Sequence, residues 1–187
     1  MKILDVLVDS AQMLGLIEEV NLLKTITPET ENDVVEQNQN VASLFNLVKF
    51  SIRELCSNYI PVIEETSVET VDKKFAVGTL ENFIRIQNIY KQGEMVKFKI
   101  INRNVVLEED SIYQVKYETY PTIVSMFEEI EFLENLSPDV IVLGLCSYFS
   151  LSHGLFDEFK NFHEQYVSKA ESLKSLHNFR IPVRSWQ

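Results

Sequence analysis

Residues 41–71 read VASLFNLVKFSIRELCSNYIPVIEETSVETV, and the pattern of their apolar side chains changes at Pro61. Before Pro61, apolar residues recur at spacings of three and four, which predicts one amphipathic helix of about five turns. This stripe consists of Val41, Leu44, Phe45, Val48, Ile52, Leu55 and Tyr59. Pro61 should end the helix, because the residue before a proline disfavours helical geometry. Residues 64–71 are polar and β-branched, and they predict a strand.

The chain between Pro61 and Pro121 keeps the two-residue period of a β-sheet. Apolar and polar residues alternate in several short runs, which predict strands. The predicted strands are residues 64–71, 83–90, 95–101, 105–107 and 112–120, with turns at 91–94, 102–104 and 108–111. Connections this short favour antiparallel neighbours. Residues 61–121 therefore predict a central antiparallel β-meander of about five strands.

Helices are expected on both sides of this sheet. Residues 1–60 should be helical, with a first helix over 3–16, a loop at 24–30, and Val34 and Val35 in a short helix or at the start of the next one. Residues 122–136 predict a loop or loose helix. A helical hairpin is expected over 137–176, because Ser137-Pro138-Asp139 is a strong helix start and Gly154 suits the turn between two helices. An extended tail should follow at 177–187. The whole chain, 1–187, predicts a single α+β domain.

Composition and charge limit the function classes. The 187 residues carry a formal net charge of −11, so a DNA-coating role is excluded, since phosphate binding depends on clustered lysine and arginine. Residues 1–72 hold 13 acidic and four basic side chains, whereas the last eleven residues hold two arginines and no acid. The longest apolar run, 140–149, is too short to cross a membrane. Asp5 and Asp9 make the N-terminus a poor signal peptide. We therefore expect a soluble protein.

The sequence shows no pattern typical of catalysis or of metal binding. His153 is expected to cap a helix C-terminus, and His163 and His177 lack ligand spacing. The five glycines are isolated, so no phosphate-binding loop is expected. Cys56 and Cys146 are expected to be small core residues. We predict no catalytic, cofactor-binding or metal-binding residue and no cofactor. An enzyme or ligand-binding domain whose site forms by convergence of distant residues stays an alternative.

The C-terminal tail holds the residue types that are enriched at interface hot spots. Trp186 is the only tryptophan, and it follows Arg184 by two residues. The tail either folds back on its own domain or docks on a partner, and the second reading is preferred.

Four segments resemble the phage head–tail connector (adaptor) proteins of the Gram-positive phage and prophage type. The resemblance lies in the order of the four segments and in the spacing between them. The first, LVKFSIRELCSNYIPV (47–62), resembles the family's second helix with its Tyr-x-Pro exit. The second combines KFKI (97–100) with IYQVKYETYP (112–121), which is similar to the strands that end in a Tyr-x-x-x-Pro exit. The third, VLGLCSYFSLSHGLFDEF (142–159), resembles the helical hairpin, and the fourth, RIPVRSW (180–186), resembles the Trp-terminated tail, with Ser185 in place of an expected arginine. The resemblance covers about residues 40–187.

This resemblance implies a structural virion protein and no enzyme. Family members form a homo-oligomeric ring, typically of twelve copies, beneath the portal protein, and they join it to a stopper or tail-completion protein. DNA passes through the ring without specific binding, and the expected location is the virion neck, after synthesis in the host cytoplasm. The residues expected to bind the portal are Arg180, Ile181, Pro182, Arg184 and Trp186. The residues expected to contact ring neighbours are Glu64, Glu65, Thr66, Phe83 and Arg85. A different neck or tail-completion ring protein is the alternative within the same context.

Overall fold

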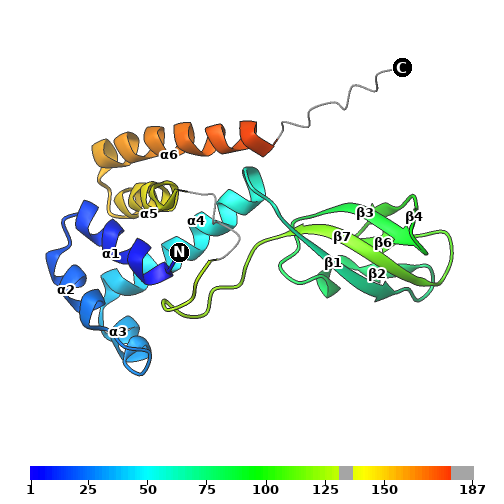
Figure 1. Ribbon diagram of the computed structural model, residues 1–187, viewed down its shortest axis with the longest axis horizontal. Helices are drawn as coiled ribbons and strands as arrows, with labels where there is room; N and C mark the ends of the chain where they lie inside the picture. The colour runs from blue at the N-terminus through cyan, green and yellow to red at the C-terminus, as the bar shows by residue number, and fades with distance from the viewer. Residues whose placement is uncertain (131–136, 178–187) are drawn as a thin grey trace, which may run out of the picture. The chain divides into compact units, whose positions relative to one another are not determined.

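The computed structural model describes residues 1–130 and 137–177, and this part of the chain has the expected α+β fold (Figure 1). It divides into two compact units. The helical unit comprises Met1–Leu55 and Ile123–Gln187, and the β unit comprises Cys56–Thr122. The single domain expected over 1–187 stays a prediction.

The helices of the first unit agree with the predicted order and add one element. They are α1 (Ile3–Met13), α2 (Ile17–Thr25), α3 (Glu31–Gln37), α4 (Gln39–Asn58), α5 (Pro138–Ser152) and α6 (Phe156–His177). Helix α1 ends earlier than predicted, because Gly15 takes a positive φ of 71° that breaks the helix and starts α2. Helix α2 was not predicted. The short helix near Val34 and the five-turn helix before Pro61 are confirmed as α3 and α4.

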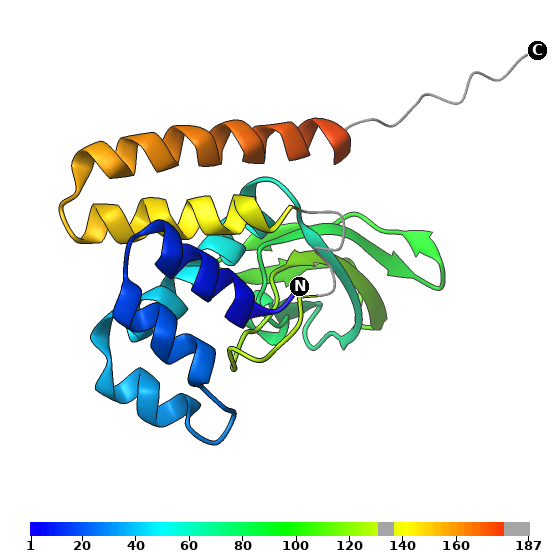
Figure 2. The ribbon, with the colours of Figure 1, turned by 60° about the vertical axis from the view of Figure 1, so that its left-hand side comes forward.

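Helix α5 lies between α1 and α6 in the helical unit (Figures 1 and 2). Its residues Val140–Ser147 are all buried, as the apolar run predicts. Gly144 permits the close approach of α6, because a Cβ atom built there would lie 3.0 Å from Cε2 of Tyr166. His153 is the C-cap of α5, with its Nδ1 2.9 Å from the carbonyl oxygen of Phe149. The predicted capping role of this histidine is therefore confirmed.

The chain that returns from the β unit closes the N-terminus of α1. The first turn of α1 has no side-chain cap. Instead, the Ile3 amide donates to the Glu128 carbonyl at 3.1 Å, and the Leu4 amide donates to the Met126 carbonyl at 2.8 Å. These main-chain bonds satisfy two of the amides that a helix start leaves without partners. Residues 123–130 thus form an ordered loop, and the rest of the predicted 122–136 loop lies partly outside the described residues.

The β unit contains seven strands, and all of their pairings are antiparallel, as predicted. The strands are β1 (Val62–Glu69), β2 (Lys74–Ala76), β3 (Arg85–Lys91), β4 (Glu94–Met95), β5 (Lys99–Ile101), β6 (Asn104–Val106) and β7 (Ile112–Thr119). Their order differs from a sequential meander, since the sheets run β1-β7-β3-β4 and β2-β6-β5. The first strand therefore pairs with the last. The buried core includes Ile89, Val105, Tyr113, Val115 and Tyr117.

Three two-residue turns connect strands that follow one another in the chain. Asp72-Lys73, Gln92-Gly93 and Asn102-Arg103 all have positive φ at both positions. This geometry defines the type I′ turn, whose twist matches that of antiparallel strands. The first turn leads the chain out of β1 into β2, which belongs to the other sheet, and β1 pairs with β7.

We expect that Arg103→Gly will raise the free energy of unfolding by about 0.5–1 kcal/mol. Arg103 has a φ of 62°, which disfavours a residue with a Cβ atom and suits glycine, and Asn-Gly is the preferred sequence for this turn. Urea denaturation measures the change. Arg103→Ala removes the same charge and keeps the Cβ atom, so equal stabilisation by both variants would contradict the backbone explanation.

Candidate functional site

The expected ring-contact residues come together at one end of the four-stranded sheet. Glu64, Glu65 and Thr66 belong to β1, Arg85 begins β3, and Phe83 precedes it by two residues. Strand β7 lies between β1 and β3, and it brings these residues within one or two strands of each other. The expected portal-binding residues, Arg180, Ile181, Pro182, Arg184 and Trp186, lie outside the described residues.

The five residues are divided between the two faces of the sheet. On the core face, the Tyr117 hydroxyl donates to Oε2 of Glu64 at 2.9 Å, and the Phe83 ring lies 6.5 Å from the Tyr117 ring. Thr66 shares this face, since it lies two residues from Glu64. Burial, followed by the hydrogen bond with Glu64, raises the pKa of Tyr117 to about 12. Glu64 therefore already has a partner within its own chain.

On the opposite face, Arg85 neutralises a buried carboxylate. Its Nη2 lies 2.8 Å from Oε1 of Glu118, whose side chain is only 5% exposed although that of Arg85 is 71% exposed. Gln87, at the β-bulge of β3, donates to the same oxygen at 3.2 Å. The hydrogen bond with Glu118 also raises the pKa of Arg85. Because a buried carboxylate needs such donors, Arg85 serves the fold as well as any contact with a neighbour.

Strand β1 forms a free, acidic edge of its sheet. The Thr70 amide donates to the Ser111 carbonyl, so even-numbered residues of β1 bond to β7 and odd-numbered residues direct their backbone groups outward. The outward residues are Ile63, Glu65, Ser67 and Glu69. All four are exposed, and within residues 1–130 and 137–177 none of their backbone groups bonds to another segment. We call β1 with Glu65 and Glu69 the acidic edge.

The small sheet presents a basic surface. Lys74 of β2 lies opposite Val106 of β6, which lies opposite Lys99 of β5, so the two lysines flank one valine on the same face. Arg103 occupies the turn at the end of this sheet, and Ile101 is 52% exposed on the same face as Lys99. In the described part of the chain, none of the three cations forms an ion pair. We call Lys74, Lys99 and Arg103 the basic face. Sequence reasoning missed it.

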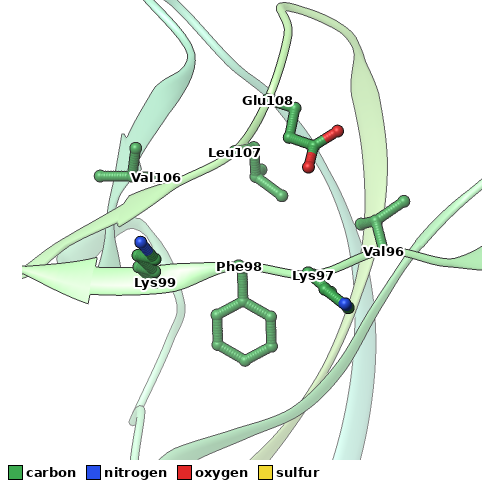
Figure 3. A pocket seen from close by; sticks show the side chains of 7 residues that line it. All are labelled: Val96, Lys97, Phe98, Lys99, Val106, Leu107 and Glu108. Atoms are coloured by element: carbon green, nitrogen blue, oxygen red, sulfur yellow. The ribbon is translucent and has the colours of Figure 1, made fainter.

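A groove of about 610 Å³ lies between residues 96–99 and 106–108, and Lys99 of the basic face is one of its lining residues (Figure 3). Val96, Phe98, Val106 and Leu107 make its walls apolar, and Lys97, Lys99 and Glu108 line it with exposed charge. A second hollow of about 240 Å³ shares Val96, Lys97, Leu107 and Glu108 with it and reaches Tyr113. The groove can hold an apolar group, but it contains no serine, cysteine or histidine that could act as a nucleophile or base.

The helical unit contains a cluster of polar side chains between α4, α5 and α6. The hydroxyls of Tyr148 and Tyr166 both donate to Oε2 of Glu54, at 2.6 and 2.9 Å. Ser147 Oγ lies 3.3 Å from Nδ1 of His163. Ser147 is fully buried in the middle of α5, where helical bonds occupy the neighbouring amides, so no oxyanion hole can form there. The cluster therefore acts in helix packing.

The two cysteines are free and buried, as predicted. Burial raises the pKa of both Cys56 and Cys146 to about 12, so neither is a thiolate at neutral pH. Among the described residues, no group of three histidine, cysteine or acidic side chains could hold a metal ion. None of the described helices is long and apolar enough to cross a membrane.

The chain was compared with protein-family models and with curated proteins. No family model matches it, and no curated sequence matches it.

Proposed function

We propose that this protein is a head–tail connector adaptor, a structural component of a phage virion neck. Copies of the chain form a ring beneath the portal protein, extend the DNA channel and present a platform to a stopper or tail-completion protein. The ring has twelve copies by analogy with the family that the sequence resembles. The protein acts in assembly and not as an enzyme.

The observation that carries the proposal is where the resembling segments lie in the fold. Residues 47–62 span the last turns of α4 and the entry into β1, and residues 112–121 span β7 and the exit from the β unit. Residues 142–159 span most of α5 and the start of α6. These three stretches each include a junction between elements, which supports the proposal more than a likeness of isolated helices would.

The distribution of charge also supports an assembly role. The β unit has an acidic edge and a basic face on different sheets, and both are exposed. A net charge of −11 suits the wall of a DNA channel, since an acidic wall does not hold phosphates. The α5–α6 hairpin favours the adaptor over a stopper, because stoppers are usually richer in β-structure.

Imaging of the protein with the portal of the same virus tests this proposal. Negative-stain micrographs should show a ring of density added to the portal, and pull-down should retain the protein on the portal. A chain that lacks residues 180–187 should lose at least about 90% of portal binding, because the tail supplies the hot-spot residues Arg184 and Trp186. Circular dichroism of the truncated chain should show the same secondary structure as that of the intact chain.

The control is Lys24→Ala with Lys160→Ala, which removes two exposed charges from the helical unit and should leave binding unchanged. Full binding by the truncated chain would contradict the role of the tail, and absence of binding by the intact chain would contradict the adaptor proposal. Neither the intact chain nor the truncated chain should retard duplex DNA in a gel-shift measurement at physiological salt.

A further inference from the structure

We infer that the acidic edge of one copy docks on the basic face of a second copy. The inference rests on the proposed function, because it assigns the contact by which neighbouring copies of a ring recognise each other. It also replaces part of the expected ring-contact set: Glu65 keeps its role, Glu64 and Arg85 have partners within the chain, and the basic side of the contact is new.

The acidic edge offers hydrogen-bond acceptors, in addition to the outward amides that any open edge strand carries. Its outward residues Ile63, Glu65, Ser67 and Glu69 offer four main-chain carbonyls that no described segment occupies, together with two exposed carboxylates. An open strand edge of this kind is a common site of association between chains. Exposed Ile63 and Ile112, which are 40% and 65% exposed, add apolar area on the same face of the sheet.

The basic face supplies donors for these carbonyls and carboxylates. Lys74 and Lys99 each bring an ammonium group with three N–H donors, and Arg103 brings a guanidinium group with five. These cations are exposed and without ion pairs in the described part of the chain, so docking breaks no salt bridge. Ile101 and Val106 lie among them and can pack against Ile63 and Ile112.

Charge excludes the two symmetric alternatives. An acidic edge against another acidic edge would bring Glu65 and Glu69 of both copies together, and two basic faces would bring lysines together. Like charges opposed across an interface weaken it strongly. The favoured contact joins two different surfaces, which is a heterologous contact, and repetition of such a contact produces a ring when its rotation closes.

Charge reversal tests the pairing. Glu65→Lys with Glu69→Lys reverses the acidic edge, and Lys74→Glu with Lys99→Glu reverses the basic face. Each variant alone should weaken self-association by about tenfold or more in sedimentation velocity at low salt. A mixture of the two variants should associate again, because each then offers the surface that the other needs. The variant with all four substitutions should associate with itself.

The matched controls change the net charge equally at other sites. Glu18→Lys with Glu36→Lys and Lys24→Glu with Lys160→Glu alter exposed residues of the helical unit and should leave association unchanged. Because Glu65 lies opposite Lys116, Ser67→Lys with Glu69→Lys provides a second reversal of the edge that keeps this pair. Thermal melting shows that each variant is folded.

Zero-length carbodiimide coupling of mixed ¹⁵N-labelled and unlabelled protein locates the contact. It should join Glu65 or Glu69 of one copy to Lys74 or Lys99 of another. Association that persists in both reversed variants overturns the inference, and so does a wild-type chain that stays monomeric and uncoupled up to about 1 mM. Neither result bears on portal binding, which tests the adaptor proposal separately. Conversely, loss of portal binding alone would not contradict the contact between copies.

Discussion

Replacement of Tyr166 by alanine should lower the free energy of unfolding by about 3–5 kcal/mol, as expected when a large buried aromatic side chain is removed. Tyr166 is fully buried at the centre of the α5–α6 hairpin. Its ring fills the space that Gly144 leaves open on α5, and its hydroxyl donates to Glu54 of α4 at 2.9 Å. The substitution therefore removes packing and a charge-assisted hydrogen bond together.

Two further variants separate these contributions, and urea denaturation measures each. Tyr166→Phe removes only the hydroxyl and should destabilise by about 1–2 kcal/mol, since Tyr148 still donates to the same carboxylate oxygen. Gly144→Ala should destabilise by about 1–3 kcal/mol, because the added Cβ atom would lie 3.0 Å from the Tyr166 ring. The double variant Gly144→Ala with Tyr166→Ala should be destabilised by less than the sum of the two single variants. The cavity that Tyr166→Ala leaves has room for the methyl group added at position 144.

Phe156→Ala is the matched control for the loss of an aromatic side chain from the same helix. Phe156 is 69% exposed, so its removal should change stability by less than about 0.5 kcal/mol. If Tyr166→Ala were no more destabilising than Phe156→Ala, the hairpin would not depend on the contact between Tyr166 and Gly144.

Local features of the sequence predicted the elements but not their pairing. The helical stripe and Pro61 act within a few residues, so α4 and the start of β1 could be predicted. The pairing of β1 with β7 depends on residues about 50 positions apart, and no local pattern encodes it. Strand β2 has only three residues, which is too short to show an alternation of apolar and polar side chains. Helix α2 has two consecutive acids in its first turn, which obscure the helical spacing of its apolar residues.

The same limit applied to the candidate site. The exposure of Glu65 could be predicted, because it lies in a polar stretch of sequence, and its contact role stays a prediction. Lys74 and Lys99 are 25 residues apart, and they share a face only because β6 pairs with both β2 and β5. The separate roles of Glu64 and Glu65 also required the structure, because adjacent residues of a strand lie on opposite faces and only the register shows that Tyr117 reaches Glu64.

Glu31→Ala should destabilise the helical unit by about 3 kcal/mol, through the loss of hydrogen bonds to a buried charged acceptor. Glu31 begins α3 within the polar run ENDVVE, which reads as solvated surface, yet it is only 7% exposed. Its Oε1 accepts the Met126 amide at 2.7 Å, and its Oε2 accepts the Ser125 hydroxyl at 2.6 Å. The carboxylate thus fixes the returning loop, whose carbonyls cap α1.

Hydrogen exchange distinguishes this role from a general loss of stability. In Glu31→Ala, the amides of Met126 and Leu4 should exchange faster than those in the middle of α5, because the loop opens before the whole unit unfolds. Glu31→Gln keeps one carbonyl acceptor and should show a smaller effect, of about 1 kcal/mol. Glu36→Ala, an exposed position on the same helix, should show none. Equal protection of the Leu4 amide in all three variants would mean that α1 keeps its cap without Glu31. The loop would then be held by the Glu128 side chain, which accepts hydrogen bonds from the Val124 and Ser125 amides.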